Sequence, residues 1–263
     1  MVPFIMHFIA LLPAFSNAIP QASLPAASAL PNYSGMGGIF GIDSSNPKGM
    51  MSTMGGSSQA SVMSTGITKK GGKIETDNSG GSGQWKAEYK TEASLANHTI
   101  YAPKSPPPGL LPIIVWGNGG CMASGLSFQN FLTEIASHGY VILANGNPGS
   151  SSKSSGLLST LNSMLSGGTK ATMLNAAIDW AEKNPTGRYG SLDLSRIAAA
   201  GQSCGGLEAY SASYADSRIK QTILFNSGVI DSSKKKLLAG LKAPVAYFLG
   251  GPTDIAYLNV SVH

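Results

Sequence analysis

The sequence has little charge and few residues that could bind a metal or act as a catalytic base. Lys, Arg, Asp and Glu make up 12% of the 263 residues, with 2 cysteines and 4 histidines. No cluster of His, Cys and Asp has the spacing of metal ligands, and no basic stripe is interleaved with aromatic residues. We therefore expect no metal, no cofactor and no nucleic-acid partner, despite a net charge of +5.

The sequence also lacks an apolar segment long enough to span a membrane. The largely apolar run at residues 4–15 has 12 residues, too few to cross a bilayer. Ser16 and Ala18 place small residues at the two positions that a signal peptidase reads, although no Lys or Arg precedes the run. We interpret residues 1–18 as a signal peptide, so that the mature protein is extracellular with no membrane partner. A buried core helix or a membrane anchor is the alternative.

Residues 19–83 show no helix or strand periodicity. Gly, Ser, Met and Thr dominate this segment, which therefore buries too little apolar surface to offset its conformational entropy. We expect a disordered Gly/Ser-rich leader here and one folded domain over residues 84–263. Sequons at Asn32, Asn97 and Asn259 are compatible with secretion.

From residue 84 onward, short apolar runs alternate with segments of helical spacing. This alternation predicts an α/β fold, in which a mostly parallel sheet is flanked by helices and an antiparallel hairpin lies at one edge. The expected strands are at residues 85–90, 99–103, 111–116, 140–144, 197–200, 222–225 and 244–249. The expected helices are at residues 128–137, 172–183 and 207–214.

The sequence Gly-Gln-Ser-Cys-Gly at residues 201–205 fits the G-x-S-x-G nucleophile elbow. An expected strand precedes it and an expected helix follows it, as that motif requires. A sharp turn would present the hydroxyl of Ser203 clear of the sheet as a nucleophile, and the N–H of Cys204 would point at the oxyanion. A structural Gly/Ser turn is the alternative.

A second loop follows the buried strand at residues 111–116 and contains Gly119, Gly120 and Cys121. Ligands gather at the carboxyl ends of parallel strands, and a hydrolase supplies its second oxyanion N–H from this position. A phosphate-binding loop is excluded, because no Gly-Lys-Ser/Thr follows the glycines.

A third loop, after the strand at residues 244–249, contains Asp254 as its one carboxylate. There it could orient and stabilise a catalytic imidazole. A turn or helix-cap role is the alternative for Asp254, and Asp231 is a rival acid.

Together these segments resemble the α/β-hydrolases of the dienelactone hydrolase and cutinase-like polyester hydrolase type. The resemblance covers residues 85–257, and the segments that carry it are residues 135–142 (Ile-Ala-Ser-His-Gly-Tyr-Val-Ile), 195–206 and 243–256. It implies a serine esterase with Ser203 as nucleophile, Asp254 as acid, and Cys204 with the Gly119–Cys121 loop as oxyanion donors. The acid of the family usually lies one residue further from the Ile-Ala pair.

The catalytic histidine of such enzymes follows the acid in the chain. His7 lies in the expected signal peptide, His98 in the hairpin, and His138 at the opposite end of the sheet from Ser203. His263 would need an irregular tail folded back across the site. We expect the last helix, the last strand and the base of a full domain to be missing from this chain. A non-catalytic secreted protein that keeps the fold is the alternative function.

The two cysteines, Cys121 and Cys204, lie in the two expected oxyanion loops. An even number of cysteines in a secreted chain favours a disulfide between them, and two buried thiols are the alternative. The connection at residues 226–243 is too short for a lid domain, so we expect an open site. Such a site suits short-chain, aromatic or polymeric esters in a monomeric protein, and a peptidase on the same fold is a third alternative.

Overall fold

The computed structural model describes residues 76–150, 168–229, 232–251, 254, 256 and 257. The expected signal peptide, most of the expected leader, Asp231, His263 and two of the three sequons lie outside these residues. The third sequon residue, Asn97, is exposed on the turn that precedes the second strand.

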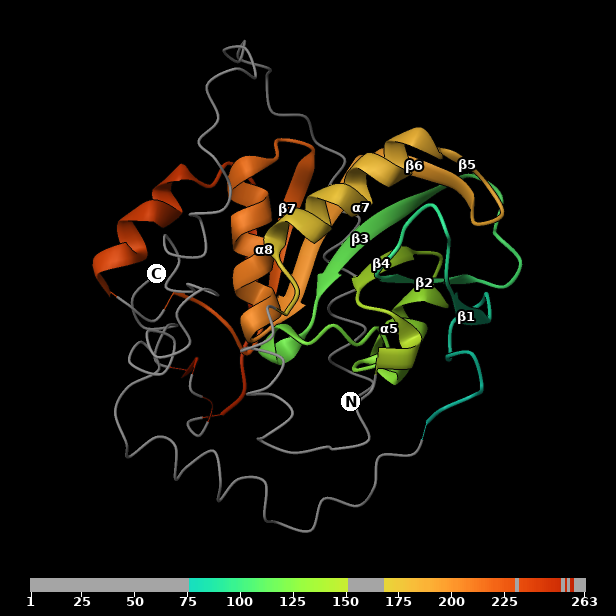
Figure 1. Cartoon of the computed structure of the whole chain (residues 1–263), viewed down its shortest axis with the longest axis horizontal. Helices are drawn as coiled ribbons and strands as arrows, with labels where there is room; N and C mark the ends of the chain where they lie inside the picture. Colours follow the sequence, from blue (N-terminus) through green and yellow to red (C-terminus); the bar gives the residue numbers. More distant parts are fainter. Residues whose placement is uncertain (1–75, 151–167, 230–231, 252–253, 255, 258–263) are drawn as a thin grey trace.

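An eight-stranded mixed sheet forms the centre of the molecule (Figure 1). The strand order is β1-β2-β4-β3-β6-β7-β8, with β5 paired to β6. Strands β3, β4, β6, β7 and β8 run parallel, while β1 and β2 are antiparallel at one edge. The strands are β1 (Ala87–Lys90), β2 (His98–Pro103), β3 (Leu110–Gly117), β4 (Val141–Asn145), β5 (Thr186–Gly187), β6 (Gly190–Gln202), β7 (Ile219–Phe225) and β8 (Val245–Phe248).

Helices cover both faces of the sheet. The α-helices in the described ranges are α5 (Gln129–Ala136), α7 (Ala171–Lys183) and α8 (Cys204–Ala215). Short 3-10 segments are η4 (Gly119–Cys121), η5 (Pro148–Ser150) and η6 (Ser232–Gly240). In the part of the chain that the structure describes, no helix is both long and apolar enough to cross a bilayer.

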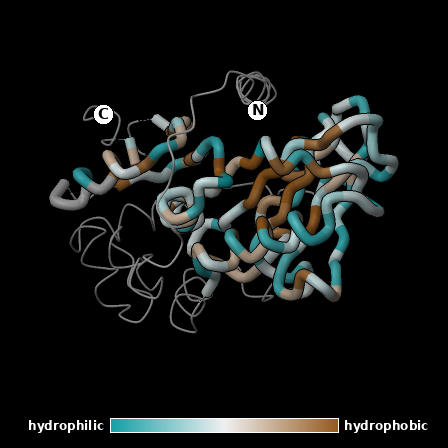
Figure 2. The backbone as a smooth tube through the Cα atoms, turned by 90° about the horizontal axis from the view of Figure 1, so that it is seen from above, coloured by the Kyte–Doolittle hydropathy of each residue, from teal (hydrophilic) through white to brown (hydrophobic). Residues whose placement is uncertain are grey.

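The two-residue period of the strands divides the core between the two faces. Ile113 and Val115 of β3 pack in the cluster that includes α7 and α8, whereas Ile114 and Trp116 pack in the cluster with α5. Figure 2 shows these apolar segments gathered at the centre of the domain. A strand with both faces covered must be apolar at every position, which explains the unbroken apolar run at residues 113–116.

The expected α/β fold, a mostly parallel sheet flanked by helices, is confirmed, and each expected strand and helix is present. Several boundaries differ from expectation, among them the start of β7 at Ile219 instead of residue 222. β6 begins at Gly190 instead of residue 197, α8 begins at Cys204 instead of residue 207, and the two-residue strand β5 was not expected. The first half of β6 is polar enough to resemble a loop, but it pairs with both β3 and β5.

Ordered contacts begin before residue 84, where the sequence places the start of the domain. The N–H of Gly83 donates to Ser137 Oγ at 2.9 Å, and the N–H of Ser82 donates to the carboxylate of Glu134 at 2.7 Å. Both acceptors lie on or beside α5, so residues 76–83 pack against the helix that covers this face of the sheet.

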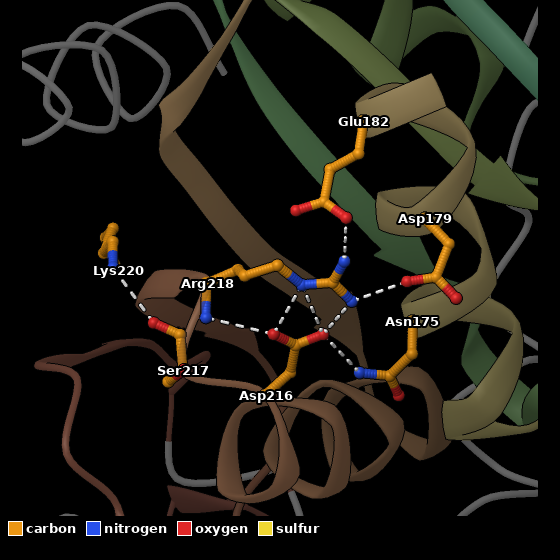
Figure 3. A network of polar contacts seen from close by, with 7 residues as sticks. All are labelled: Asn175, Asp179, Glu182, Asp216, Ser217, Arg218 and Lys220. Carbon is orange, nitrogen blue, oxygen red and sulfur yellow. Dashed lines mark hydrogen bonds and ion pairs between the residues drawn. The ribbon is translucent and has the colours of Figure 1, made fainter. Parts of the chain in front are cut away.

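A polar network joins α7 to the turn between α8 and β7 (Figure 3). The Arg218 guanidinium donates to Asp216 through Nε and Nη2, to Glu182 at 2.6 Å and to Asp179 at 2.7 Å. Burial raises the pKa of Asp216, but hydrogen bonds from Arg218 and Asn175 outweigh burial and hold that pKa below its ordinary value. The network fastens the two helices on one face of the sheet to each other.

Candidate active site

Ser203 lies on a strained turn between the central strand β6 and helix α8. Its backbone has φ 52° and ψ −118°, a left-handed conformation that costs a non-glycine residue about 1–3 kcal/mol. The glycines beside it are required sterically, since a Cβ on Gly201 would lie 2.2 Å from the carbonyl oxygen of Gly205. The chain therefore passes from strand to helix in a sharp turn with no room for a Cβ at Gly201, as the elbow pattern predicts.

Strand β7 and the loop after it hold the backbone of Ser203 in this conformation. The Ser203 N–H donates to the carbonyl of Phe225 at 2.9 Å, and Ser227 Oγ donates to the carbonyl of Ser203 at 2.7 Å. The Ser203 hydroxyl makes no cap hydrogen bond to α8. The side chain is thus not used to stabilise the helix that it precedes.

A disulfide joins the elbow to the loop after β3. Cys121 and Cys204 are bonded, with their Cα atoms 5.3 Å apart, and the predicted bridge is confirmed. Gly120 and Cys121 both have positive φ values, 64° and 49°, so this loop is tightly turned. Because Cys204 directly follows Ser203, the bridge fixes the loop against the elbow.

The first N–H groups of a helix have no partner within the helix, so the Cys204 N–H at the start of α8 is suited to an oxyanion. In the other loop, the Cys121 N–H donates to the carbonyl of Asn118 at 3.1 Å. Gly119 and Gly120 lie in the same tight turn before Cys121, so their N–H groups are the remaining candidates for a second donor.

Asn118 is the buried residue that shapes this loop, and sequence reasoning did not identify it. Its Nδ2 donates to the carbonyls of Met122, Ser124 and Asn145 at 3.0, 3.1 and 2.7 Å. Its Oδ1 accepts from Trp116 Nε1 at 3.1 Å. A polar residue directly after a buried strand was the available signal, but the sequence does not show which carbonyls it meets.

Asp254 lies at the same edge of the sheet as Ser203. Its Oδ2 accepts from Asn226 Nδ2 at 2.6 Å and from the Gly250 N–H at 2.7 Å, and its Oδ1 accepts from the Ala256 N–H at 2.9 Å. Burial raises the pKa of the Asp254 carboxyl, but these three hydrogen bonds outweigh burial and lower it below its ordinary value. Asp254 is therefore ionised at neutral pH and also closes its own turn.

Two consecutive residues at the end of β7 connect Ser203 to Asp254. Phe225 accepts from the Ser203 N–H, and the next residue, Asn226, donates from its side chain to Asp254. The elbow, the glycine loop after β3 and Asp254 are thus all at the carboxyl edge of the parallel strands, the usual ligand position in such sheets.

The two described histidines are engaged elsewhere. The ring nitrogens of His98 are 2.9 Å from the Ala96 carbonyl and 3.0 Å from the Met173 carbonyl. His138 Nε2 pairs with Glu134 at the end of α5. Because these contacts occupy both rings in the part of the chain that the structure describes, an imidazole base would come from outside the described residues.

Glu208, one and a half turns into α8, is a second residue that the sequence did not indicate as special. Its side chain is 4% exposed and accepts one hydrogen bond, from Asn145 Nδ2 at 3.2 Å. Burial raises the pKa of Glu208 to about 7, and nearby Thr169 and Asn145 counteract burial in part. Burial therefore favours the neutral form of this carboxyl.

Across the described ranges, no three His, Cys, Asp or Glu side chains are arranged to hold a metal ion. No protein-family model matches the chain, and no curated protein matches it in sequence. The functional interpretation therefore depends on the geometry of the site.

Proposed function

We propose that this protein is a secreted serine ester hydrolase of the α/β-hydrolase type with Ser203 as its nucleophile. The observation that carries the proposal is the strained elbow at Ser203, which is bonded through Cys204 to the glycine loop after β3. A strained non-glycine turn between a buried strand and a helix costs free energy, and such strain is concentrated at functional sites. The disulfide also supports an extracellular location, since disulfides persist in oxidising compartments.

In the proposed reaction, Ser203 Oγ attacks the ester carbonyl carbon, and the carbonyl electron pair moves to oxygen. The N–H groups of Cys204 and of Gly119 or Gly120 stabilise that oxyanion. The hydroxyl proton passes to an imidazole and then to the alcohol, which leaves as its C–O bond breaks. Water then attacks the acyl-enzyme carbonyl, and the imidazole takes a proton from it and returns the proton to Ser203 Oγ as the carboxylic acid leaves. The ionised Asp254 stabilises the imidazolium.

The engagement of His98 and His138 in other contacts favours a second candidate function, a non-catalytic extracellular protein that keeps the fold. In that case Ser203 would keep its backbone conformation without an activated hydroxyl. Losing one triad member typically lowers the rate by about 10⁴-fold or more, so the two candidates differ sharply in reactivity.

Labelling with a fluorophosphonate probe tests the proposal. We expect the full chain to react with the probe and to hydrolyse p-nitrophenyl acetate, and Ser203→Ala to lose both activities. Ser217→Ala, which changes an exposed serine outside the site, should keep both. If a folded, disulfide-bonded sample does not react with the probe, the result would contradict the proposed esterase function and favour the non-catalytic protein.

A further inference from the structure

Glu208 lies directly behind the loop at residues 117–121, which is called the oxyanion loop below. Its Oε2 is so close to the end of β3 that a Cβ on Gly117 would lie 2.8 Å from it. The helix and strand backbones also touch there, because a Cβ on Gly205 would lie 2.1 Å from the Gly117 carbonyl. The loop that begins at Gly117 therefore rests on the carboxyl of Glu208 and on the first turn of α8.

The two polar neighbours of this carboxyl also hold the oxyanion loop. Asn145 donates to Glu208, and its own carbonyl accepts from Asn118, the residue that shapes the loop. Thr169 lies beside Glu208, and its N–H donates to the Cys121 carbonyl at 2.8 Å. Any displacement of the Glu208 carboxyl would thus be transmitted to the loop at both Asn118 and Cys121.

When Glu208 is ionised, the buried cluster around it holds more acceptors than donors, since only Asn145 Nδ2 and the Thr169 hydroxyl can donate. Asn145 Oδ1, Thr169 Oγ1 and Glu208 Oε1 are buried without hydrogen-bond partners. Thr169 is near enough to influence the carboxyl, but these two oxygens do not form a hydrogen bond with good geometry. A proton on Glu208 adds a donor for the unpaired acceptors, whereas a negative charge there would be buried with one side-chain hydrogen bond and no counter-ion.

Lys183, the last residue of α7, is exposed, and the other charged side chains on the elements that pack against α8 have other partners. These are Asp179 and Glu182 of α7 with Arg218, Asp193 of β6 with Arg196, and Lys220 of β7 with the Ser217 carbonyl. The groups that face Glu208 from β3, β4 and the segment before α7 are neutral. In the described part of the chain, the carboxyl therefore has no counter-ion.

We propose that protonated Glu208 is a positioning residue that holds the oxyanion loop in its productive geometry, and that its ionisation displaces the loop. The catalytic part of this proposal rests on the proposed esterase function. Deprotonation of Glu208 near pH 7 would then lower the rate of hydrolysis by displacing the loop. Deprotonation of an imidazole base has the opposite effect, because it raises the rate.

The test compares the wild type with Glu208→Gln and with the control Glu182→Gln, which makes the same change at an exposed position on α7. The rate of p-nitrophenyl acetate hydrolysis is measured from pH 5.5 to 9. We expect kcat of the wild type and of the control to fall about tenfold from its maximum by pH 9. Glu208→Gln should show no such decline, because its amide cannot ionise. Identical profiles for the wild type and Glu208→Gln would overturn the proposal.

A second readout does not need activity. The Trp116 indole N–H donates to Asn118, so its NMR signal, assigned with Trp116→Phe, reports on the loop. We expect this signal to titrate near pH 7 in the wild type and to stay fixed in Glu208→Gln. If the Trp116 signal titrates in the wild type but neither the wild type nor any variant hydrolyses the ester, the positioning role stands and the proposed esterase function fails. If it does not shift in the wild type, the positioning role is wrong, even should Glu208→Gln fail to fold.

Discussion

The disulfide between Cys121 and Cys204 should supply a large part of the stability of the domain. The two residues are 83 positions apart in the chain. Closing a loop of that length lowers the entropy of the unfolded chain enough to stabilise the folded state by about 4–5 kcal/mol. We therefore expect Cys121→Ala/Cys204→Ala to lose roughly that amount, with a small further loss from the two missing sulfur atoms.

Urea unfolding, followed by tryptophan fluorescence, measures this loss directly. The wild type should unfold at a much lower urea concentration after reduction, and the reductant should not change the double variant. A variant that loses less than about 1 kcal/mol would refute the reasoning, because loop closure would then contribute little. Peptide mapping without reductant that finds both thiols free would refute it at an earlier step.

Other substitutions test other parts of the fold. The folded pKa of Glu208, about 7, exceeds its ordinary value of 4.5, so the folded state keeps a proton that the unfolded chain has released. The wild type should therefore lose on the order of 3 kcal/mol relative to Glu208→Gln as pH rises from 4.5 to 7, measured by urea unfolding at each pH. Asn118→Ala leaves the Trp116 indole N–H and three backbone carbonyls without their hydrogen-bond partner. Thermal unfolding of this variant should show a loss of about 3 kcal/mol of stability. Arg218→Ala should cost about 2 kcal/mol at pH 7, whereas Asp179→Asn, at an exposed partner, should cost under about 0.5 kcal/mol. Because the pKa of Asp216 is lowered in the folded state, the cost of Arg218→Ala should disappear in unfolding curves recorded below the pH at which Asp216 protonates.

The central strands were predictable from continuous apolar runs and helices α5 and α7 from their helical spacing, whereas α8 was predictable from its place after the elbow pattern. The run at residues 111–116 is apolar at successive positions, which a strand covered on both faces requires, and Gly201 and Gly205 mark a turn that admits no Cβ. The disulfide was predictable once Cys121 and Cys204 had each been assigned to a loop at the same edge of the sheet.

The residues that shape the site from behind were not predictable in the same way. Asn118 and Glu208 act through groups on β4 and before α7, and no local pattern encodes those distant partners. The first half of β6 was missed for a related reason, since Asp193, Ser195 and Arg196 are polar residues that hydrogen-bond to one another in the structure. Asp193 pairs with Pro112 of β3, whereas Ser195 and Arg196 lie in the irregular stretch before the pairing resumes at Ile197.

The cross-link between Cys121 and Cys204 also determines what a protease could release. A peptide bond cut between Asn145 and Ala171 would give one piece with β1 to β4 and another with β5 to β8. These pieces would remain joined covalently by the disulfide and non-covalently by the pairing of β3 with β6 at the middle of the sheet. The protein could therefore persist as a nicked, two-chain molecule, and electrophoresis would reveal the cut after reduction of the sample.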